Sequence, residues 1–168
     1  MNEPKWIQIA RSHIGEREIK GPKHNPLIVR WWEALKAPFR DDETAWCGAF
    51  VGGVLYEAGM ADKIVKGPAG ARNWLNCGVP LSKPALGAIV VFWRGSPMGW
   101  SGHVGFVVGK DRFGHLMVLG GNQGDSVNIK PFGTDRVLGY RWPSVWPAES
   151  RYELPILTSD GRVSKNEA

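Results

Sequence analysis

One segment of this 168-residue chain limits its fold more than any other. Residues 44–58, TAWCGAFVGGVLYEA, are apolar around nearly the whole circumference of a helix. A helix that is apolar on all sides must be buried, so this segment predicts the central helix of the domain, with Gly59 placed to end it. Gly48, Gly52 and Gly53 each cost about 1 kcal/mol of helix propensity. We interpret this cost as room for a sheet that approaches the helix backbone closely.

The segments on either side of the central helix also have helical patterns. Apolar residues recur at helical spacing within residues 4–16. Asn25 followed by Pro26 is typical of a helix start and predicts a second helix over residues 26–36. A short fourth helix is predicted over residues 69–78. The first half of the chain is therefore predicted to be helical.

The second half of the chain changes to a strand pattern. Short apolar or alternating segments, separated by Gly, Asp and Pro, occupy residues 86–94, 102–111, 115–122, 126–132 and 137–143. Their hairpin spacing predicts a curved antiparallel sheet of about five strands. Helices followed by strands indicate an α+β fold rather than a doubly wound one. We predict a single domain over residues 1–147 and a polar tail over residues 148–168 that is dispensable for chemistry.

The net charge and the spacing of the cysteines limit the classes of partner and cofactor that the chain is expected to bind. The formal net charge of +5 favours an anionic partner such as nucleic acid, a membrane surface or the bacterial cell wall. No Lys/Arg-rich run of the length typical of nucleic-acid patches is present, so we predict no nucleic-acid partner. Cys47 and Cys77 have neither disulfide-framework nor metal-ligand spacing, so we predict no metal and no cofactor.

The start of the chain lacks the apolar core of a signal peptide, and no apolar run is long enough to span a bilayer. We therefore expect synthesis in the cytoplasm without a signal peptide, and no insertion into a membrane. We also expect a monomer.

Cys47 lies in the opening turn of the predicted central helix, where Thr44 is placed to cap the first N–H groups. The positive end of a helix dipole stabilises a thiolate and lowers the pKa of a cysteine there. A free cysteine, however, is among the most buried residue types and usually behaves as a small apolar residue. The helix alone leaves both interpretations open.

A thiol nucleophile needs a base and a third group that orients the base. Among the four histidines, His103 is placed best, because it begins a strand between Gly102 and Gly105. Asn122 ends the next strand and can accept the imidazole N–H. We predict a triad of Cys47, His103 and Asn122, with His103 partly accessible and within hydrogen-bond reach of the Cys47 sulfur. The remaining histidines are interpreted as structural or solvated: His13, His24 and His115.

Four segments together resemble a known family. They are GPKHNPLIV, WCGAFVGGVLYEAG, GAIVVFWRG…GHVGFVVG and VLGGNQGDSVNI…VLGYRWP. They resemble the papain-like bacterial and phage cell-wall cysteine peptidases of the NlpC type, relatives of the CHAP amidases, over about residues 5–143. The resemblance implies a papain-like fold with Cys47 as nucleophile, His103 as base and Asn122 as the third polar residue.

The same resemblance implies a peptidoglycan partner. Such enzymes typically cleave an amide bond in the stem peptide of the wall. The lack of a signal peptide favours a phage lysin, a virion-borne enzyme or a secreted toxin, acting there after release or delivery, over a housekeeping hydrolase. The N–H of Cys47 is expected to meet the oxyanion, with a second donor from the region of Asp42, Glu43 and Thr44. The aromatic residues that flank the motifs are candidates for a substrate groove, and equally for the core: Trp46, Trp93 and Trp100.

Two other classes of function stay open. Cys47 and His103, joined by another His or Asp, are also side chains that bind Zn²⁺ in a wall amidase, although paired ligand spacing is absent. The basic charge and the aromatic residues are compatible with a non-catalytic wall-binding or virion structural module. The intact set of Cys47, His103 and Asn122 argues against that module.

Overall fold

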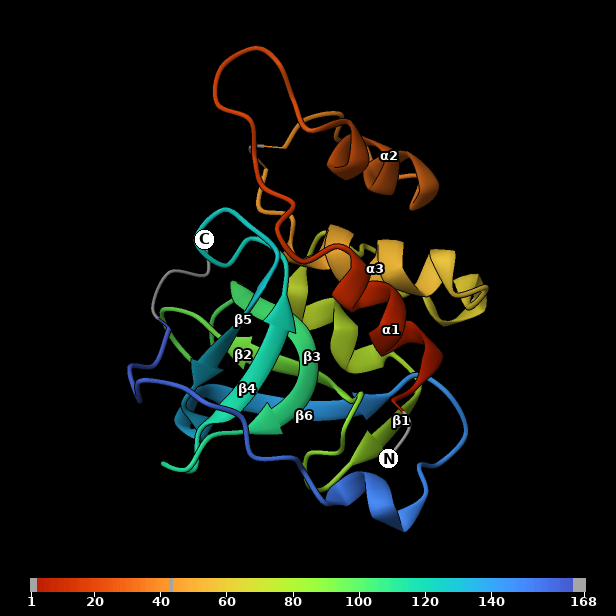
Figure 1. The fold of residues 1–168 in the computed structure, drawn as a ribbon. Helices are drawn as coiled ribbons and strands as arrows, with labels where there is room; N and C mark the ends of the chain where they lie inside the picture. Colours follow the sequence, from red (N-terminus) through yellow and green to blue (C-terminus); the bar gives the residue numbers. More distant parts are fainter. Residues whose placement is uncertain (1–2, 43, 165–168) are drawn as a thin grey trace.

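The computed structural model describes residues 3–42 and 44–164; Glu43 and the end of the predicted tail, residues 165–168, lie outside them. Within the described residues, α-helices precede a single six-stranded sheet (Figure 1). The α-helices are α1 (Lys5–Ser12), α2 (Pro26–Ala34) and α3 (Cys47–Glu57). The strands are β1 (Val79–Leu81), β2 (Ile89–Trp93), β3 (Gly102–Lys110), β4 (Leu116–Gly120), β5 (Asn128–Phe132) and β6 (Val137–Trp142). Short 3₁₀ helices occupy η1 (Ala61–Lys63), η2 (Ala71–Asn76), η3 (Thr134–Arg136) and η4 (Glu149–Tyr152).

The sheet is antiparallel, with the strand order β1-β6-β2-β3-β4-β5. It has one strand more than expected, because β1 is too short to show a pattern in the sequence. The sheet is strongly curved: the ring centroids of Phe92 in β2 and Phe132 in β5 are 4.9 Å apart, although β3 and β4 lie between their strands. The predicted α+β fold, with helices packed on a curved antiparallel sheet, is confirmed.

Helix α3 is the buried centre of the domain. Every residue from Cys47 to Leu55 is buried, as its apolar circumference predicts. The helix begins at Cys47 rather than at Thr44, and no side chain caps it. The N–H and hydroxyl of Thr44 donate to the carboxylate of Asp41 instead, so the prediction that Thr44 caps the helix is wrong.

The glycines of α3 make room for segments other than the sheet: Gly48 for the carbonyl of Pro68, and Gly52 and Gly53 for side chains of α2 and the residue after it. A Cβ at Gly52 would collide with Leu35, and one at Gly53 would collide with the ring of Trp31 on α2. The expectation that the sheet requires these glycines is therefore wrong. Two helices pack backbone against side chain here, which is why the cost in helix propensity is tolerated.

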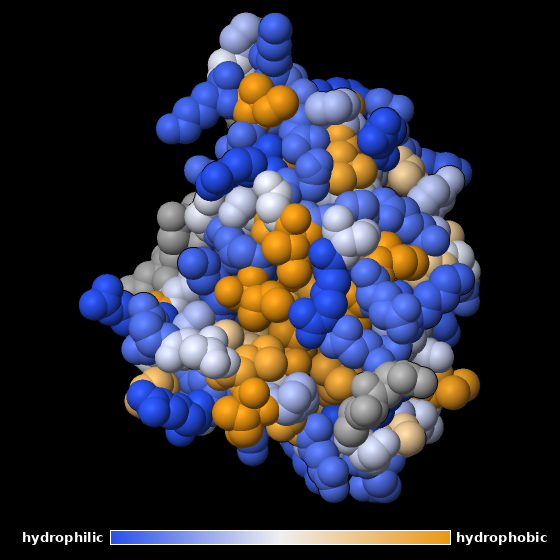
Figure 2. Space-filling model, in the orientation of Figure 1, coloured by the Kyte–Doolittle hydropathy of each residue, from blue (hydrophilic) through white to orange (hydrophobic). Residues whose placement is uncertain are grey.

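The loop between α1 and α2 projects from the domain (Figure 1), and polar side chains cover most of the projecting part (Figure 2). Its base is held by the buried carboxylate of Asp42, which accepts the N–H groups of Ile19 and Asn25 and contacts Nδ1 of His24 at 3.0 Å. Burial raises the pKa of Asp42, but these hydrogen bonds and the charge of His24 outweigh it and hold the pKa below its usual value. Asp42 is therefore an anchor for this loop.

The segment after residue 147 packs against the domain. The N–H of Lys110 donates to Pro155 at 2.9 Å, and the N–H of Leu157 donates to Lys110 at 2.8 Å, so the chain runs beside the end of β3. A Cβ at Gly109 would collide with Leu157. The sequence shows none of this, because backbone groups make most of these contacts. Within the described residues, no helix has both the length and the apolar character needed to cross a membrane.

Asp111 fastens this segment to the turn after β3. Its buried carboxylate accepts hydrogen bonds from the N–H groups of Phe113 and His115 and from the hydroxyl of Ser159. Burial raises the pKa of Asp111, but the bonds from Ser159, His115 and Phe113 outweigh burial and lower the pKa. A lowered pKa stabilises the fold above the unfolded value of about 4, and this contribution is lost as the pH falls through the folded value.

We expect Asp111→Asn to lower the melting temperature at pH 7. The neutral amide has one acceptor oxygen and no negative charge, so it cannot replace the carboxylate in all these hydrogen bonds. The difference from the wild type should shrink at pH 3 and below. Thermal unfolding followed by circular dichroism at both pH values measures it. Asp62→Asn is the control, since the side chain of Asp62 is 76% exposed. An Asp111→Asn deficit that is equal at both pH values would contradict the role of the ionised carboxylate.

Candidate active site

Cys47 is the first residue of α3 and is 3% exposed. Burial raises the pKa of its thiol, and this outweighs the N–H groups of Val104 and Gly48 and the charge of Arg94, which lower it. The prediction of a lowered pKa is therefore wrong for the resting structure, because the start of the helix is covered rather than solvated. At neutral pH the resting residue is an uncharged thiol.

The pairing between β3 and β4 stops short of the part of β3 that lies next to Cys47. The pairing of β3 with β4 ends at Phe106 and Leu119, so Val104 lies beyond the last pair of these strands. The N–H of Val104 lies close enough to the Cys47 thiol to lower its pKa. The sulfur therefore lies against the β3 backbone, one residue after His103.

His103, the second residue of β3, is completely buried. Its ring stacks on Phe132, with centroids 5.4 Å apart and planes 8° apart, and on Phe92, with centroids 6.3 Å apart. The prediction of partial accessibility is wrong, because the curvature of the sheet brings β5 over the imidazole. The two phenyl rings fix the plane in which the imidazole lies.

A carboxamide faces the imidazole, and it belongs to Gln123. Nε2 of His103 is 3.0 Å from Oε1 of Gln123. Asn122, the residue expected there, is buried with a φ of 59°, and its Oδ1 has no hydrogen-bond partner among the described residues. The expected type of group is therefore present, but it comes from the next residue along the chain.

The orientation of the Gln123 amide is set by its neighbours. Its Nε2 donates to the carbonyl of Asn128 at 3.0 Å, to Oδ1 of Asn128 at 2.9 Å and to the carbonyl of Val118 at 3.3 Å. With acceptors around the nitrogen, the amide oxygen must face His103. An amide oxygen only accepts, so Nε2 of His103 carries the proton, and Nδ1 is the basic nitrogen of the neutral ring.

Two consecutive glycines, Gly120 and Gly121, leave space beside this cluster because they have no side chain. A Cβ at Gly120 would collide with Oε1 of Gln123 and approach Nε2 of His103 to 3.3 Å. A Cβ at Gly121 would meet Phe50 and Trp46 on the helix side. The Gly-Gly pair therefore lets the histidine cluster and the start of α3 approach the same stretch of backbone from its two sides.

A pocket of about 340 Å³ opens over Cys47. Its lining combines the start of α3, the start of η2 and the loop between β2 and β3: Ala45, Cys47, Ala69, Gly70, Ala71, Arg94, Trp100, Ser101 and Gly102. Trp100 is 89% exposed, so a large aromatic surface stands at the mouth of the pocket.

The loop that carries Trp100 is clamped by Arg72 of η2. The guanidinium of Arg72 donates to the carbonyls of Ser101 at 2.8 Å, Pro97 at 2.9 Å and Ser96 at 2.6 Å. The N–H of Arg94 also donates to Ser101, at 3.1 Å. The wall of the pocket is therefore held by backbone carbonyls.

The other predicted groove residues lie elsewhere. Trp46 is completely buried, and its Nε1 donates to Glu18 at 2.8 Å. Its interpretation as a groove residue is wrong, because its ring fills the core beneath the Gly-Gly pair. Trp93 is half-buried at the end of β2 and does not line the pocket.

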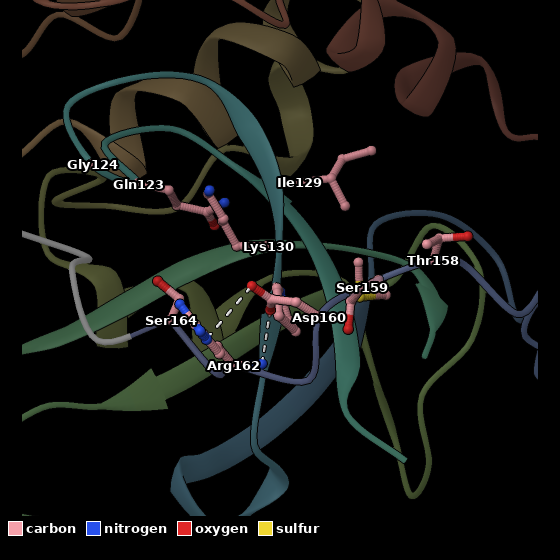
Figure 3. A pocket seen from close by; sticks show the side chains of 11 residues that line it. Gln123, Gly124, Ile129, Lys130, Thr158, Ser159, Asp160, Arg162 and Ser164 are labelled. Carbon is pink, nitrogen blue, oxygen red and sulfur yellow. Dashed lines mark hydrogen bonds and ion pairs between the residues drawn. The ribbon is translucent and has the colours of Figure 1, made fainter. Parts of the chain in front are cut away.

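A larger pocket of about 690 Å³ lies between β5 and the C-terminal segment, and Figure 3 shows Lys130, Arg162 and Ser164 around it. Gln123 is among its lining residues. Arg162 pairs there with Asp160. Its lining holds neither a cysteine nor a histidine, so we assign the candidate chemistry to the smaller pocket over Cys47.

The remaining histidines have structural contacts. His13 contacts Glu57 at 2.7 Å, His24 contacts Asp42 at 3.0 Å and His115 contacts Asp111 at 3.0 Å. Asp42 and Thr44, from the region expected to supply the second oxyanion donor, are engaged elsewhere as described, and Glu43 lies outside the described residues. Among residues 3–42 and 44–164, no three His, Cys, Asp or Glu side chains are grouped as metal ligands.

Comparison with known proteins gives one family. The model of the CHAP domain matches residues 39–122, half of the chain. The match runs from just before α3 to Asn122 and so includes Cys47 and His103. A search of curated proteins returned no significant match.

Proposed function

Because the chain belongs to the CHAP domain family, and this membership indicates hydrolase or amidase activity on peptidoglycan, we propose that it cleaves an amide bond in the peptide part of the wall. Cys47 is the nucleophile and His103 the base. The observation that carries the proposal is the Cys47 sulfur at the N–H of Val104, next to a histidine whose Nε2 is held by Gln123.

The first step is acyl transfer. The raised pKa of Cys47 means that the base must take the thiol proton as the sulfur attacks. The sulfur bonds to the substrate carbonyl carbon, the C–N bond breaks, and the proton passes through Nδ1 of His103 to the leaving amine. Water then hydrolyses the thioester and restores the thiol.

Gln123 takes the orienting role. Its Oε1 accepts the hydrogen bond from the Nε2–H group of His103, which keeps Nδ1 basic and stabilises the imidazolium that forms during attack. Phe132 and Phe92 hold the ring in plane, and Asn128 holds the Gln123 amide. The third residue of the proposed site is thus Gln123 in place of Asn122.

The start of α3 supplies electrostatic stabilisation. The oxyanion that forms on attack lies next to the sulfur, where the N–H of Cys47 belongs to the unsatisfied first turn of the helix. One such donor contributes on the order of 3 kcal/mol to the transition state. Trp100 offers its exposed ring to the sugar or peptide beside the scissile bond.

The test is digestion of purified peptidoglycan, with the fragments identified by mass. We expect each cut to add one water, to release a new free amine and to create no new reducing sugar. Release of reducing sugars would show glycan cleavage instead. Binding to the wall without any cleavage would favour the non-catalytic module.

A further inference from the structure

Trp100 is a large apolar side chain that the fold leaves in water. A single exposed apolar residue is ordinary on a protein surface, but this one lines the same pocket as Cys47. It is 89% exposed, so its ring adds little buried area to the core of the domain. An exposed indole at a binding pocket is typical of a contact residue, because a ligand that covers it removes a large apolar area from water.

The loop that carries Trp100 has a fixed backbone. The carbonyl of Arg94 accepts hydrogen bonds from the N–H of Ser96 at 2.8 Å and from the hydroxyl of Ser101 at 3.1 Å. The guanidinium of Arg72 holds the same loop through its carbonyls. A tryptophan side chain has only two rotatable bonds, so little conformational entropy is lost when a ligand packs on its ring. The ring is therefore presented to a ligand at a defined place on the pocket wall.

Peptidoglycan, the substrate that membership in the CHAP domain family indicates, contains one kind of surface that matches such a ring. Its stem peptides consist mainly of small, acidic and diamino acids, which have no broad apolar face. The pyranose rings of its glycan strand have a face of C–H groups. These hydrogens carry a partial positive charge, and the face of an aromatic ring carries the negative part of its quadrupole. A sugar ring is therefore the part of the substrate that best complements Trp100.

We infer that Trp100 is a specificity-determining residue that stacks on a sugar of the glycan strand while the attached peptide enters the pocket over Cys47. The inference rests on the proposed function and adds the substrate class: peptides still attached to their sugar, in preference to peptides without one. The pocket of about 340 Å³ has the size of a small-ligand site, and both residues line it. The amide that is cut therefore lies near the sugar end of the peptide.

The experiment compares two soluble substrates that have the same amide bonds. One is a disaccharide-linked stem peptide, and the other is the same peptide carrying only the lactoyl group of its muramic acid, without the sugar rings. For the wild type we expect kcat/KM to be about three- to tenfold higher for the disaccharide-linked peptide, the usual size of an aromatic contact. For Trp100→Leu the ratio should fall to about one. Trp100→Phe should retain part of it, because phenylalanine keeps an aromatic face.

Trp146→Leu is the matched control and should keep the wild-type ratio, because Trp146 is 62% exposed and does not line the pocket. A wild type that cleaves both substrates equally, or a Trp100→Leu variant that slows both by the same factor, would overturn the inference while leaving the proposed function standing. Fragment masses that place the cut at the far end of the peptide would do the same. A wild type that cleaves neither substrate and no peptidoglycan would overturn the proposed function itself.

Discussion

Cys47→Ala should leave the protein folded and lower amide cleavage in peptidoglycan by at least about a thousandfold. In the proposed mechanism the sulfur forms the bond to the substrate, and among the described residues no other thiol lines the pocket. Alanine is close to cysteine in volume, so the buried start of α3 should keep its packing. Release of free amines from purified peptidoglycan, beside a circular dichroism spectrum, measures both expectations.

Cys77→Ala is the matched control. Cys77 is also buried, and its thiol donates to the carbonyl of Lys63. Burial raises the pKa of Cys77 to about 11, with the charges of Lys63 and Arg141 acting against it. Because it lies outside the pocket, this variant should retain activity. Cleavage by Cys47→Ala at the wild-type rate would refute the thiol mechanism.

The burial of Cys47 also sets the pH dependence of its alkylation. Its raised pKa keeps the thiol protonated through the neutral range, and only the thiolate reacts. In a Cys77→Ala background, the reaction with iodoacetamide should be slow at pH 7. Its rate should increase only at pH values above the ordinary thiol pKa of about 8.5. Rapid alkylation below pH 7 would instead indicate a preformed ion pair with His103.

His103→Ala should reduce kcat by roughly a hundred- to ten-thousandfold, the usual contribution of a positioned general base. The loss should be smaller at alkaline pH, where hydroxide removes the thiol proton without a base. Initial rates on soluble stem peptides from pH 6 to 10 measure both effects. His13→Ala is the control, because His13 contacts Glu57 away from the pocket. Equal losses across this pH range would argue that His103 is structural.

Variants of Gln123 and Asn122 decide which carboxamide orients His103. Gln123→Leu removes the acceptor and should lower kcat about tenfold or more, because the imidazole loses its fixed tautomer. Gln123→Glu keeps an acceptor at Nε2 and should recover most of that loss. Asn122→Gly suits the positive φ of that position and should lower kcat less than Gln123→Leu. The opposite ranking would return the role to Asn122.

The sequence predicts most of the sheet because each strand has an apolar pattern within its own few residues. Apolar or alternating runs mark β2 to β6 in the sequence, whereas β1 has three residues including Pro80, too few to show a pattern. The packing of the C-terminal segment is invisible for another reason. Backbone groups of Pro155 and Leu157 make those contacts, and backbone groups have no sequence signature.

The same distinction explains the candidate site. The sequence places Cys47 and His103 as candidates, because each lies at the start of a regular element with a recognisable pattern. It places Asn122 at the end of a strand over residues 115–122, but β4 ends at Gly120 and the chain turns with a positive φ at Asn122. Side chains alternate between the two faces of a sheet only within a strand, so beyond this turn the sequence does not predict which side chain faces the histidine. The raised pKa of Cys47 depends on burial, which only the assembled domain determines.

The clamp by Arg72 bears on how this pocket can change during evolution. Arg72 grips the loop through the carbonyls of Ser96, Pro97 and Ser101, and every amino acid supplies a carbonyl. Substitutions at Met98 or Trp100, which are 92% and 89% exposed, therefore leave the clamp intact. The rim can acquire new side chains for a different wall chemistry while the backbone that frames Cys47 keeps its shape.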